Sequence, residues 1–295
     1  MSAAVVADVI QSDQRGRAGR KRRSHGLGIV GVSSAVVIGL AVIIAVAGPS
    51  LAPHDPNAVN LANAYGGSTL RGMHILGFDS QGRDLLSRLL AGARTAMIGP
   101  VFVVGLAMLI GTTLAVASAW RGGWFDTSVS AVNDILFAFP GILLAVLATA
   151  MFGRGLTAAS IALTVAYVPY VARVLRSAAV RERSLQYVSA LEVQGQSPVR
   201  ICLAHIVPNL LRLAVAEATI LFGFAMLDLA AISFLGLGVQ PPQADWGVMV
   251  SEGETGVLLG SPGEAIIAGL AIVAVVSAFN LLGERLADRA LESDR

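Results

Sequence analysis

Six long apolar runs, spaced from one end of the chain to the other, limit what this sequence can fold into. They cover residues 27–48, 95–120, 135–153, 155–172, 209–234 and 265–283. A helix needs about 20 mainly apolar residues to cross a bilayer. Since unpaired backbone polar groups cannot face lipid, each run is expected to form a helix. The pattern predicts an all-α, polytopic membrane protein with six transmembrane helices.

Charge supports the membrane assignment. Only 14% of the residues are charged, and the mean hydropathy is +0.72, whereas soluble proteins carry about 25% charged residues. A pI near 9.0 could indicate a nucleic-acid partner, but the basic residues gather in a tail and in short loops, so the bilayer is the expected partner instead. Cys202 is the only cysteine, which excludes an intrachain disulfide and a cysteine-based metal cluster.

The distribution of basic residues predicts the orientation. With the basic tail inside, five of the 21 Lys and Arg residues fall outside, namely Arg71, Arg83, Arg88, Arg94 and Arg154. The positive-inside rule therefore favours cytoplasmic termini. The first run is longer than the 7–15 apolar residues of a signal peptide, so we expect it to remain as an anchor.

These patterns give an expected organisation in five parts. In chain order they are a cytoplasmic basic tail (1–26), a first transmembrane helix (27–48), an external segment with an interfacial helix (49–94), a five-helix core with a cytoplasmic loop at 173–208 (95–283), and a cytoplasmic tail (284–295).

The cytoplasmic loop contains a long polar interruption, "YVSALEVQGQSPVRICLAHIVPN". Residues 186–194 are expected to form a short helix, on which Tyr187 and Leu191 stack at i,i+4. Gly195 can close that helix, and Ser197 and Pro198 can begin a second one that runs to about Ile206. Pro208 then marks entry into the next span. The result is helix, bend, helix. Such a loop either lies against the underside of its own protein or projects so that another protein can grip it.

The same loop resembles the coupling motif of ABC-importer membrane subunits. That motif reads Glu-Ala-Ala, three residues, Gly, and then a Pro some way on. Here its positions are occupied by Ser189, Ala190, Leu191, Gly195 and Pro208, so the Glu and the second Ala differ.

Three further segments are similar to dipeptide, oligopeptide and nickel permeases. They are residues 74–99, 126–146 and 233–253, the last with Ala244 where the family usually has Pro. Because an isolated first helix precedes the five-helix core, the chain resembles the C-type subunit of these importers.

The resemblance implies a non-enzymatic half-channel in the bacterial cytoplasmic membrane. Its implied partners are a B-type permease subunit, two ABC ATPase subunits and an external solute-binding protein, and its implied cargo is dipeptides or oligopeptides. Nickel or another small solute is an alternative cargo. The loop would be the coupling helix, with Tyr187 and Leu191 as anchors.

The absence of an ATP-binding motif in the sequence also indicates that another chain supplies the energy for transport. A P-loop requires a Lys followed by Ser or Thr, but the only lysine, Lys21, is followed by Arg22. We therefore expect no cofactor on this chain, with ATP and Mg on the partner ATPases. The alternative class is a secondary transporter driven by an ion gradient. Such carriers more often show inverted repeats and broken helices, and we find neither in the sequence.

Two acids fall within the fifth run. Glu217 and Asp228 are 11 residues, or three helical turns, apart and so share one face. Acids in a span normally face the bundle interior or a water-filled cavity. They are candidates to line the path and meet a substrate ammonium; the alternatives are pairing with a helix of the partner subunit, or snorkelling to an interface.

The remaining candidate site residues lie mostly in segments predicted to be external. Arg83, Asp84 and Arg88 read as part of an ion-paired helix at the lipid surface, and Trp246 as an interfacial anchor. Contact with the binding protein is the functional alternative for all four. The spacing of His54, His74 and His205 fits no ligand pattern, so we expect no metal site.

Overall fold

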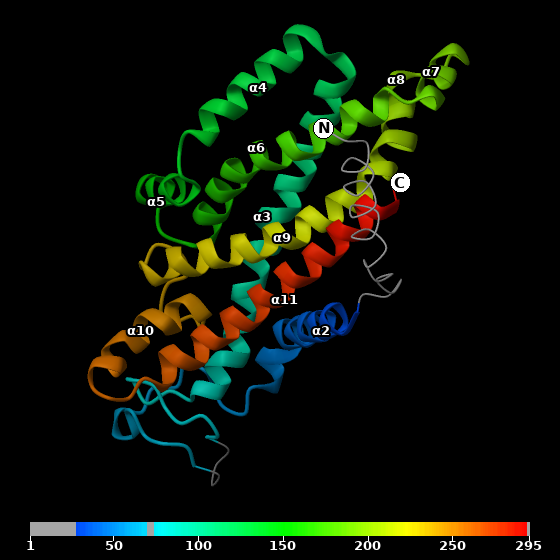
Figure 1. The fold of residues 1–295 in the computed structure, drawn as a ribbon. Helices are drawn as coiled ribbons and strands as arrows, with labels where there is room; N and C mark the ends of the chain where they lie inside the picture. Colours follow the sequence, from blue (N-terminus) through cyan, green and yellow to red (C-terminus); the bar gives the residue numbers. More distant parts are fainter. Residues whose placement is uncertain (1–27, 70–73, 294–295) are drawn as a thin grey trace, which may run out of the picture.

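The computed structural model describes residues 28–69 and 74–293, and this part is all-α, with isolated bridges as its only β structure. Figure 1 shows the helices. In chain order they are α2 (Gly28–Leu51), the 3₁₀ turn η1 (Leu61–Asn63), α3 (Leu85–Arg121), α4 (Gly123–Phe137), α5 (Gly141–Phe152), α6 (Leu156–Arg183), α7 (Gln186–Val193), α8 (Pro198–Ile201), the π-helical segment η2 (Cys202–Ile206), α9 (Val207–Phe234), α10 (Trp246–Leu258) and α11 (Gly263–Ser293). The predicted tail at 1–26, Leu27, Arg71 and Arg295 lie outside the described residues.

Five of these helical stretches are long and apolar enough to cross a membrane. They are Gly28–Leu51, Leu85–Arg121, Leu156–Arg183, Pro198–Phe234 and Gly263–Arg289. The pair α4 and α5 makes a sixth if it is counted as one span. The predicted fold class, a polytopic helical membrane protein, is confirmed.

The prediction of one continuous helix over residues 135–153 is wrong. The chain breaks between Phe137 and Gly141, and α4 and α5 meet at 80°. Pro140 explains the break, because it has no N–H for the helix ladder and disfavours helical backbone at Phe139. Both halves still pack beside α6 (Figure 1).

The external segment differs from the expectation as well. A separate interfacial helix was predicted within residues 49–94, but the described residues from Leu85 to Arg94 are the first turns of α3. Asp84 is the N-cap of α3, since its carboxylate accepts a hydrogen bond from the backbone N–H of Ser87 at 2.8 Å. The span predicted to start at Thr95 therefore begins ten residues earlier.

Helix α3 is the centre of the packing. It contacts α2, α6 and α9 along its length. Its approach to α6 depends on Gly111, where an added Cβ would lie 2.6 Å from the Cβ of Val171. Close helix contact through small residues is typical of membrane bundles, in which apolar burial drives association less than packing does.

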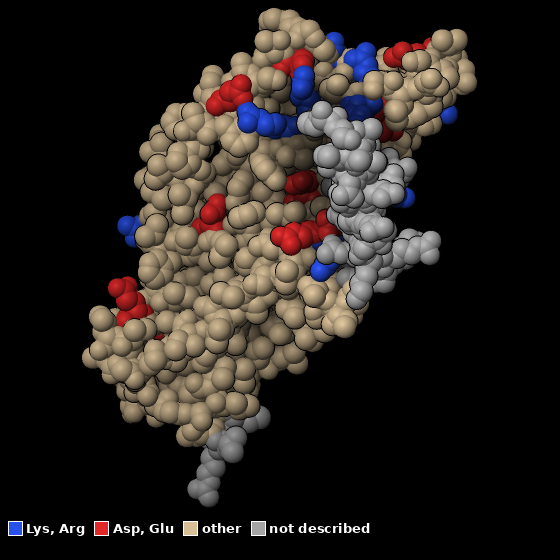
Figure 2. Space-filling model, viewed as in Figure 1, with Lys and Arg blue, Asp and Glu red and all other residues tan. Residues whose placement is uncertain are grey.

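The molecule has two ends with different character. Residues 52–69 and 74–84, the start of α3 and α10 lie together at one end, which we call the α10 end, and α7 and α8 project at the opposite end (Figure 1). On the face shown in Figure 2, most Lys and Arg atoms lie toward the end where α7 and α8 project. The two candidate sites described below lie at these opposite ends of the bundle.

Candidate functional site

The projection formed by α7 and α8 has the expected helix-bend-helix shape. Gly195 closes α7 with φ at +77°, a left-handed value that suits glycine. The Ser197 hydroxyl caps α8 by accepting from the N–H of Arg200 at 3.4 Å, and Pro198 occupies the first turn. The predicted roles of these three residues in the local fold are confirmed.

Pro208 marks the start of the next span, as predicted: η2 ends at Ile206, and Pro208 lies in the first turn of α9, which begins at Val207. The chain nevertheless stays helical from Pro198 through η2 into α9. Pro208 has no N–H to donate to the carbonyl four residues back. The wider π-helical turn directly before it, Cys202–Ile206, accommodates that missing bond.

The projection is fixed to the bundle by a small apolar cluster of its own. Val188 of α7 and Ile201 of α8 are fully buried, and they pack with the ends of α3, α6 and α9. The cluster also includes Val116, Ala119, Ala178, Ala179, Ile206 and Leu210. A rigid attachment of this kind transmits a push on the projection to three spans at once.

Polar contacts strengthen this attachment. The Tyr187 hydroxyl donates to the Glu182 carboxylate at 2.6 Å, and Asn209 donates to the same carboxylate at 2.6 Å, so α6, α7 and α9 are linked. Burial, together with the Glu182 carboxylate, raises the pKa of Tyr187 to about 12, so its hydroxyl keeps the proton that it donates. Arg183 bonds the carbonyls of Ala119 and Trp120 at the end of α3.

The predicted anchors point the wrong way. Tyr187 and Leu191 are half-buried and pack against the cluster described above, so they hold the projection rather than extend from it. The outward apolar side chains are Val193, 89% exposed, and Val199, 68% exposed. The sequence carried a signal for this: Tyr187, Val188 and Leu191 share one helix face, which leaves Ser189, Ala190 and Val193 on the other.

The two acids of α9 face α6. The Tyr170 hydroxyl donates to Glu217 at 2.8 Å, and the Tyr167 hydroxyl donates to Asp228 at 2.7 Å. Among the described residues neither acid forms an ion pair with an Arg. Each carboxylate is half-buried, so it keeps capacity to accept further hydrogen bonds. Acidic side chains are visible in the middle of the face shown in Figure 2, in the region where Figure 1 places α6 and α9.

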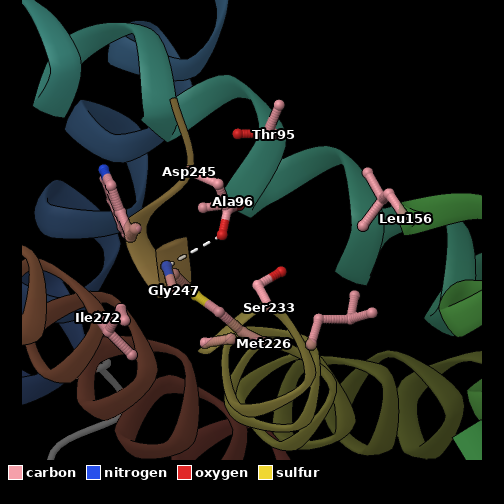
Figure 3. A pocket seen from close by; sticks show the side chains of 11 residues that line it. Thr95, Ala96, Leu156, Met226, Ser233, Asp245, Gly247 and Ile272 are labelled. Atoms are coloured by element: carbon pink, nitrogen blue, oxygen red, sulfur yellow. Dashed lines mark hydrogen bonds between the residues drawn. The ribbon is translucent and has the colours of Figure 1, made fainter. Parts of the chain in front are cut away.

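An apolar groove opens between α3 and the α8–α9 stretch, near the projection. Its volume is about 720 Å³. Its lining includes Met108, Thr112, Trp120, Val199 and Leu211. By contrast, the cavity beside Asp245, Thr95 and Ser233 (Figure 3) is only about 10 Å³, which is too small for a solute.

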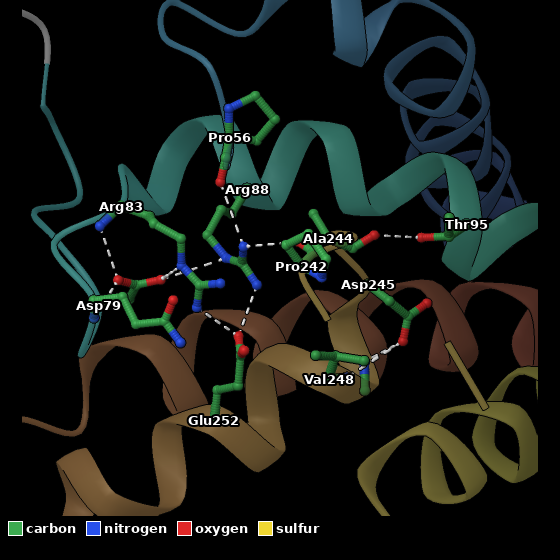
Figure 4. A network of polar contacts seen from close by, with 12 residues as sticks. Pro56, Asp79, Arg83, Arg88, Thr95, Pro242, Ala244, Asp245, Val248 and Glu252 are labelled. Atoms are coloured by element: carbon green, nitrogen blue, oxygen red, sulfur yellow. Dashed lines mark hydrogen bonds and ion pairs between the residues drawn. The ribbon is translucent and has the colours of Figure 1, made fainter. Parts of the chain in front are cut away.

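At the α10 end, a network of buried charges joins the external segment to α3 and α10 (Figure 4). Glu252 of α10 accepts from both Arg83 and Arg88, each at 2.7 Å, and Asp79 pairs with Arg83 as well. Burial alone would lower the pKa of Arg83, but Asp79 and Glu252 outweigh it and raise that pKa.

This network corrects the prediction of a binding-protein contact. Arg83, Asp84, Arg88 and Trp246 are at most 4% exposed. The Trp246 indole N–H donates to the carbonyl of Leu89 at 2.9 Å, so this residue anchors α10 to α3. A buried side chain cannot meet another protein directly, and the prediction is wrong for all four residues.

The histidines are distributed unevenly. The rings of His54 and His74 stack at the α10 end with centroids 4.1 Å apart, whereas His205 lies in η2 at the opposite end. Their separation along the chain gave no indication that the first two meet, because that contact depends on how segments far apart in the sequence pack together.

Comparison with known proteins identifies the family. Residues 107–291 match the family described as binding-protein-dependent transport system inner membrane component. The dipeptide transport system permease protein DppC of Alkalihalophilus pseudofirmus is 35% identical over 91% of this chain and 86% of its own length. The glutathione transport system permease protein GsiD is 35% identical over 91% of this chain and 87% of its own length in Escherichia coli O157:H7, and 38% identical over 73% and 71% in Pectobacterium atrosepticum. This chain belongs to the family of binding-protein-dependent transport system inner membrane components.

Proposed function

We propose that this chain is the pore-forming subunit of an importer that moves short peptides across the bacterial cytoplasmic membrane, driven by separate ATPase subunits. The observation that carries the proposal is the rigid projection of α7 and α8, which the cluster around Val188 and Ile201 fixes to three spans. The relatives named for dipeptide and glutathione transport support a peptide cargo. Nickel remains the alternative cargo to be tested.

The proposed mechanism is a rocking gate. An ATPase subunit grips the outward face of the projection, which includes Ser189, Ala190 and Val193. When the ATPase pair closes on ATP, the projection moves as a unit with the ends of α3, α6 and α9, and the bundle changes from inward-open to outward-open. A homologous B-type subunit completes the path, and a binding protein delivers the solute externally.

The proposed orientation places the projection in the cytoplasm with both termini, and the α10 end outside. The unequal distribution of basic residues supports it. Exposed apolar side chains along the spans, such as Val36, Leu109 and Leu270, fit contact with lipid or with the second permease subunit.

We propose that Glu217 and Asp228 line the path. A carboxylate within a span is costly unless it faces water or a polar partner, and within the described chain each of these two accepts a hydrogen bond from one tyrosine hydroxyl. Each tyrosine holds one side of the carboxylate and leaves the other free. The ammonium group of a peptide can bind there as it passes.

The test is uptake by the assembled transporter in proteoliposomes, with the B-type subunit, both ATPases and the binding protein present. We expect ATP-dependent uptake of labelled dipeptide or tripeptide, and no ATP-dependent uptake of Ni²⁺. Asp228→Asn should lower peptide uptake about tenfold with normal assembly, because it removes a charge that binds the ammonium group. Unchanged uptake by that variant would remove Asp228 from the path.

A separate arm tests the class of transporter. The chain alone, reconstituted with a proton or sodium gradient, should accumulate nothing. Accumulation under those conditions would contradict the proposal, since it would show that no ATPase is needed.

A further inference from the structure

Three side chains with metal-ligand chemistry converge at the α10 end. His54 follows α2, His74 lies in the external segment, and Asp84 caps α3. The His74 Nδ1 lies 2.9 Å from Asp84 Oδ1, and the His54 Nδ1 lies 3.8 Å from Asp84 Oδ2. One ligand atom from each residue lies within 4.8 Å of the other two.

We propose that His54, His74 and Asp84 form a binding site for a divalent transition-metal ion of the Zn²⁺ class. Tetrahedral Zn²⁺ sits about 2.0–2.2 Å from nitrogen and oxygen ligands, so neighbouring ligand atoms lie roughly 3.3 Å apart. The two measured distances lie on either side of that value. Two imidazoles and one carboxylate are a ligand set that Zn²⁺ accepts, with water in the fourth position.

The His54 ring supplies the observation that points to a missing ligand. Its Nδ1 is shielded from solvent and has no hydrogen-bond partner among the described residues. A buried polar atom without a partner costs free energy. The same Nδ1 lies 3.8 Å from Asp84 Oδ2, which is too far for a hydrogen bond.

The supporting contacts are already in place. Ser87 donates to Asp84 Oδ2 from its backbone N–H at 2.8 Å and from its hydroxyl at 2.6 Å. The Ser87 hydroxyl also accepts from the His54 N–H at 3.1 Å, which fixes the backbone of one ligand against the carboxylate of another. Contacts that orient the ligands in this way are typical of metal sites.

Access and ring geometry set how the ion enters. The side chains of His54 and His74 are 33% and 22% exposed, whereas that of Asp84 is 2% exposed. The rings are stacked with an angle of 20° between their planes. A metal ion lies near the plane of each imidazole that binds it, so His54, the more exposed of the two rings, must turn out of the stack when the ion binds.

The other acidic group at this end is a poorer site. Asp79, Glu252 and Glu264 also approach one another, but Arg83 and Arg88 already neutralise Asp79 and Glu252. Two guanidinium groups repel an added cation. His54, His74 and Asp84 form no recorded ion pair with Lys or Arg in the described chain. An ion there would fasten the segment after α2 to the start of α3.

Titration calorimetry of the assembled transporter, purified through a tag without histidine, tests the proposal with Zn²⁺ alone. We expect the wild-type complex to bind one more Zn²⁺ than the His54→Phe complex, because phenylalanine keeps the ring stack and removes only the ligand atom. His74→Asn, which can still donate to Asp84, should weaken binding at this site at least tenfold. Mg²⁺ should not occupy it, since hard cations prefer oxygen ligands.

His205→Ala is the matched control, because it removes a histidine at the opposite end of the bundle. It should bind Zn²⁺ as the wild type does. Zn²⁺ should also raise the unfolding temperature of the wild type and of this control more than that of either ligand variant. Equal Zn²⁺ stoichiometry and affinity in wild type, His54→Phe and His74→Asn would overturn the proposal, as would the absence of any Zn²⁺ binding by the wild type.

Discussion

At the scale of single residues, Glu252 joins two buried arginines to α10. Its carboxylate accepts from two buried guanidinium groups, those of Arg83 and Arg88. Removing one partner from a buried ion pair is far more costly than removing the whole pair, because a buried charge is then left without compensation. Glu252 thus holds α10 against α3 at the end where the binding protein is proposed to dock.

Glu252→Gln should destabilise the protein by about 3 kcal/mol. The amide has nearly the shape of the carboxylate, so the loss reflects charge rather than packing. Thermal unfolding of the assembled transporter, followed by the appearance of aggregated chain, detects this loss as a lower unfolding temperature.

Glu254→Gln is the control for this prediction, because the same change falls two residues along α10 on an exposed side chain. It should leave the unfolding temperature unchanged. If both variants unfold at the wild-type temperature, the buried network does not stabilise this end of the molecule.

At the scale of elements, the projection depends on one backbone conformation. Gly195 has φ at +77°, and a Cβ added there would meet nothing within 4 Å. Alanine at this position therefore changes no packing; it adds only the cost of a left-handed residue, about 1 kcal/mol. That cost favours other arrangements of α7 relative to α8 by roughly fivefold.

Gly195→Ala should accordingly lower ATP-driven uptake several-fold while the ATPase subunits still assemble with the permease. The ratio of solute transported to ATP hydrolysed measures this directly. Gly105→Ala on α3 is the matched control, since that glycine is exposed, has ordinary helical backbone and has open space around its Cα. A Gly195→Ala complex with a wild-type ratio would show that the bend need not be held by glycine.

Element type was more predictable than element ends or directions. Hydrophobic run length identified the spans, and the Gly195, Ser197 and Pro198 signals identified the bend, because both are local properties of the sequence. The break before Gly141 was missed although Pro140 signalled it. Burial of Arg83 and Arg88 could not be read locally, because both pair with Glu252, which is more than 160 residues away.

The contacts of the candidate site divide in the same way, into those that local sequence predicts and those that depend on long-range packing. Sequence spacing correctly placed Glu217 and Asp228 on one face of α9, since a helix fixes that relation. It could not show that Tyr170 and Tyr167 of α6 bind them, nor that His54 and His74 meet, because those contacts depend on how separate segments pack. Tyr187 and Leu191 were identified as a pair, but their direction depends on where the rest of the bundle lies.

At the scale of the whole molecule, the proposal depends on which end faces the cytoplasm. Cys202 is the only cysteine, so Cys202→Ser gives a background in which single cysteines report location. Val193 of α7 and Leu258 of α10 are strongly exposed at opposite ends. In intact cells, a thiol reagent that cannot cross the membrane should label Leu258→Cys and leave Val193→Cys unlabelled. After permeabilisation both should react, because both side chains then meet the reagent. The reverse pattern would place α7 and α8 outside, where no ATP-driven subunit can reach them, and the coupling mechanism would fail together with the orientation.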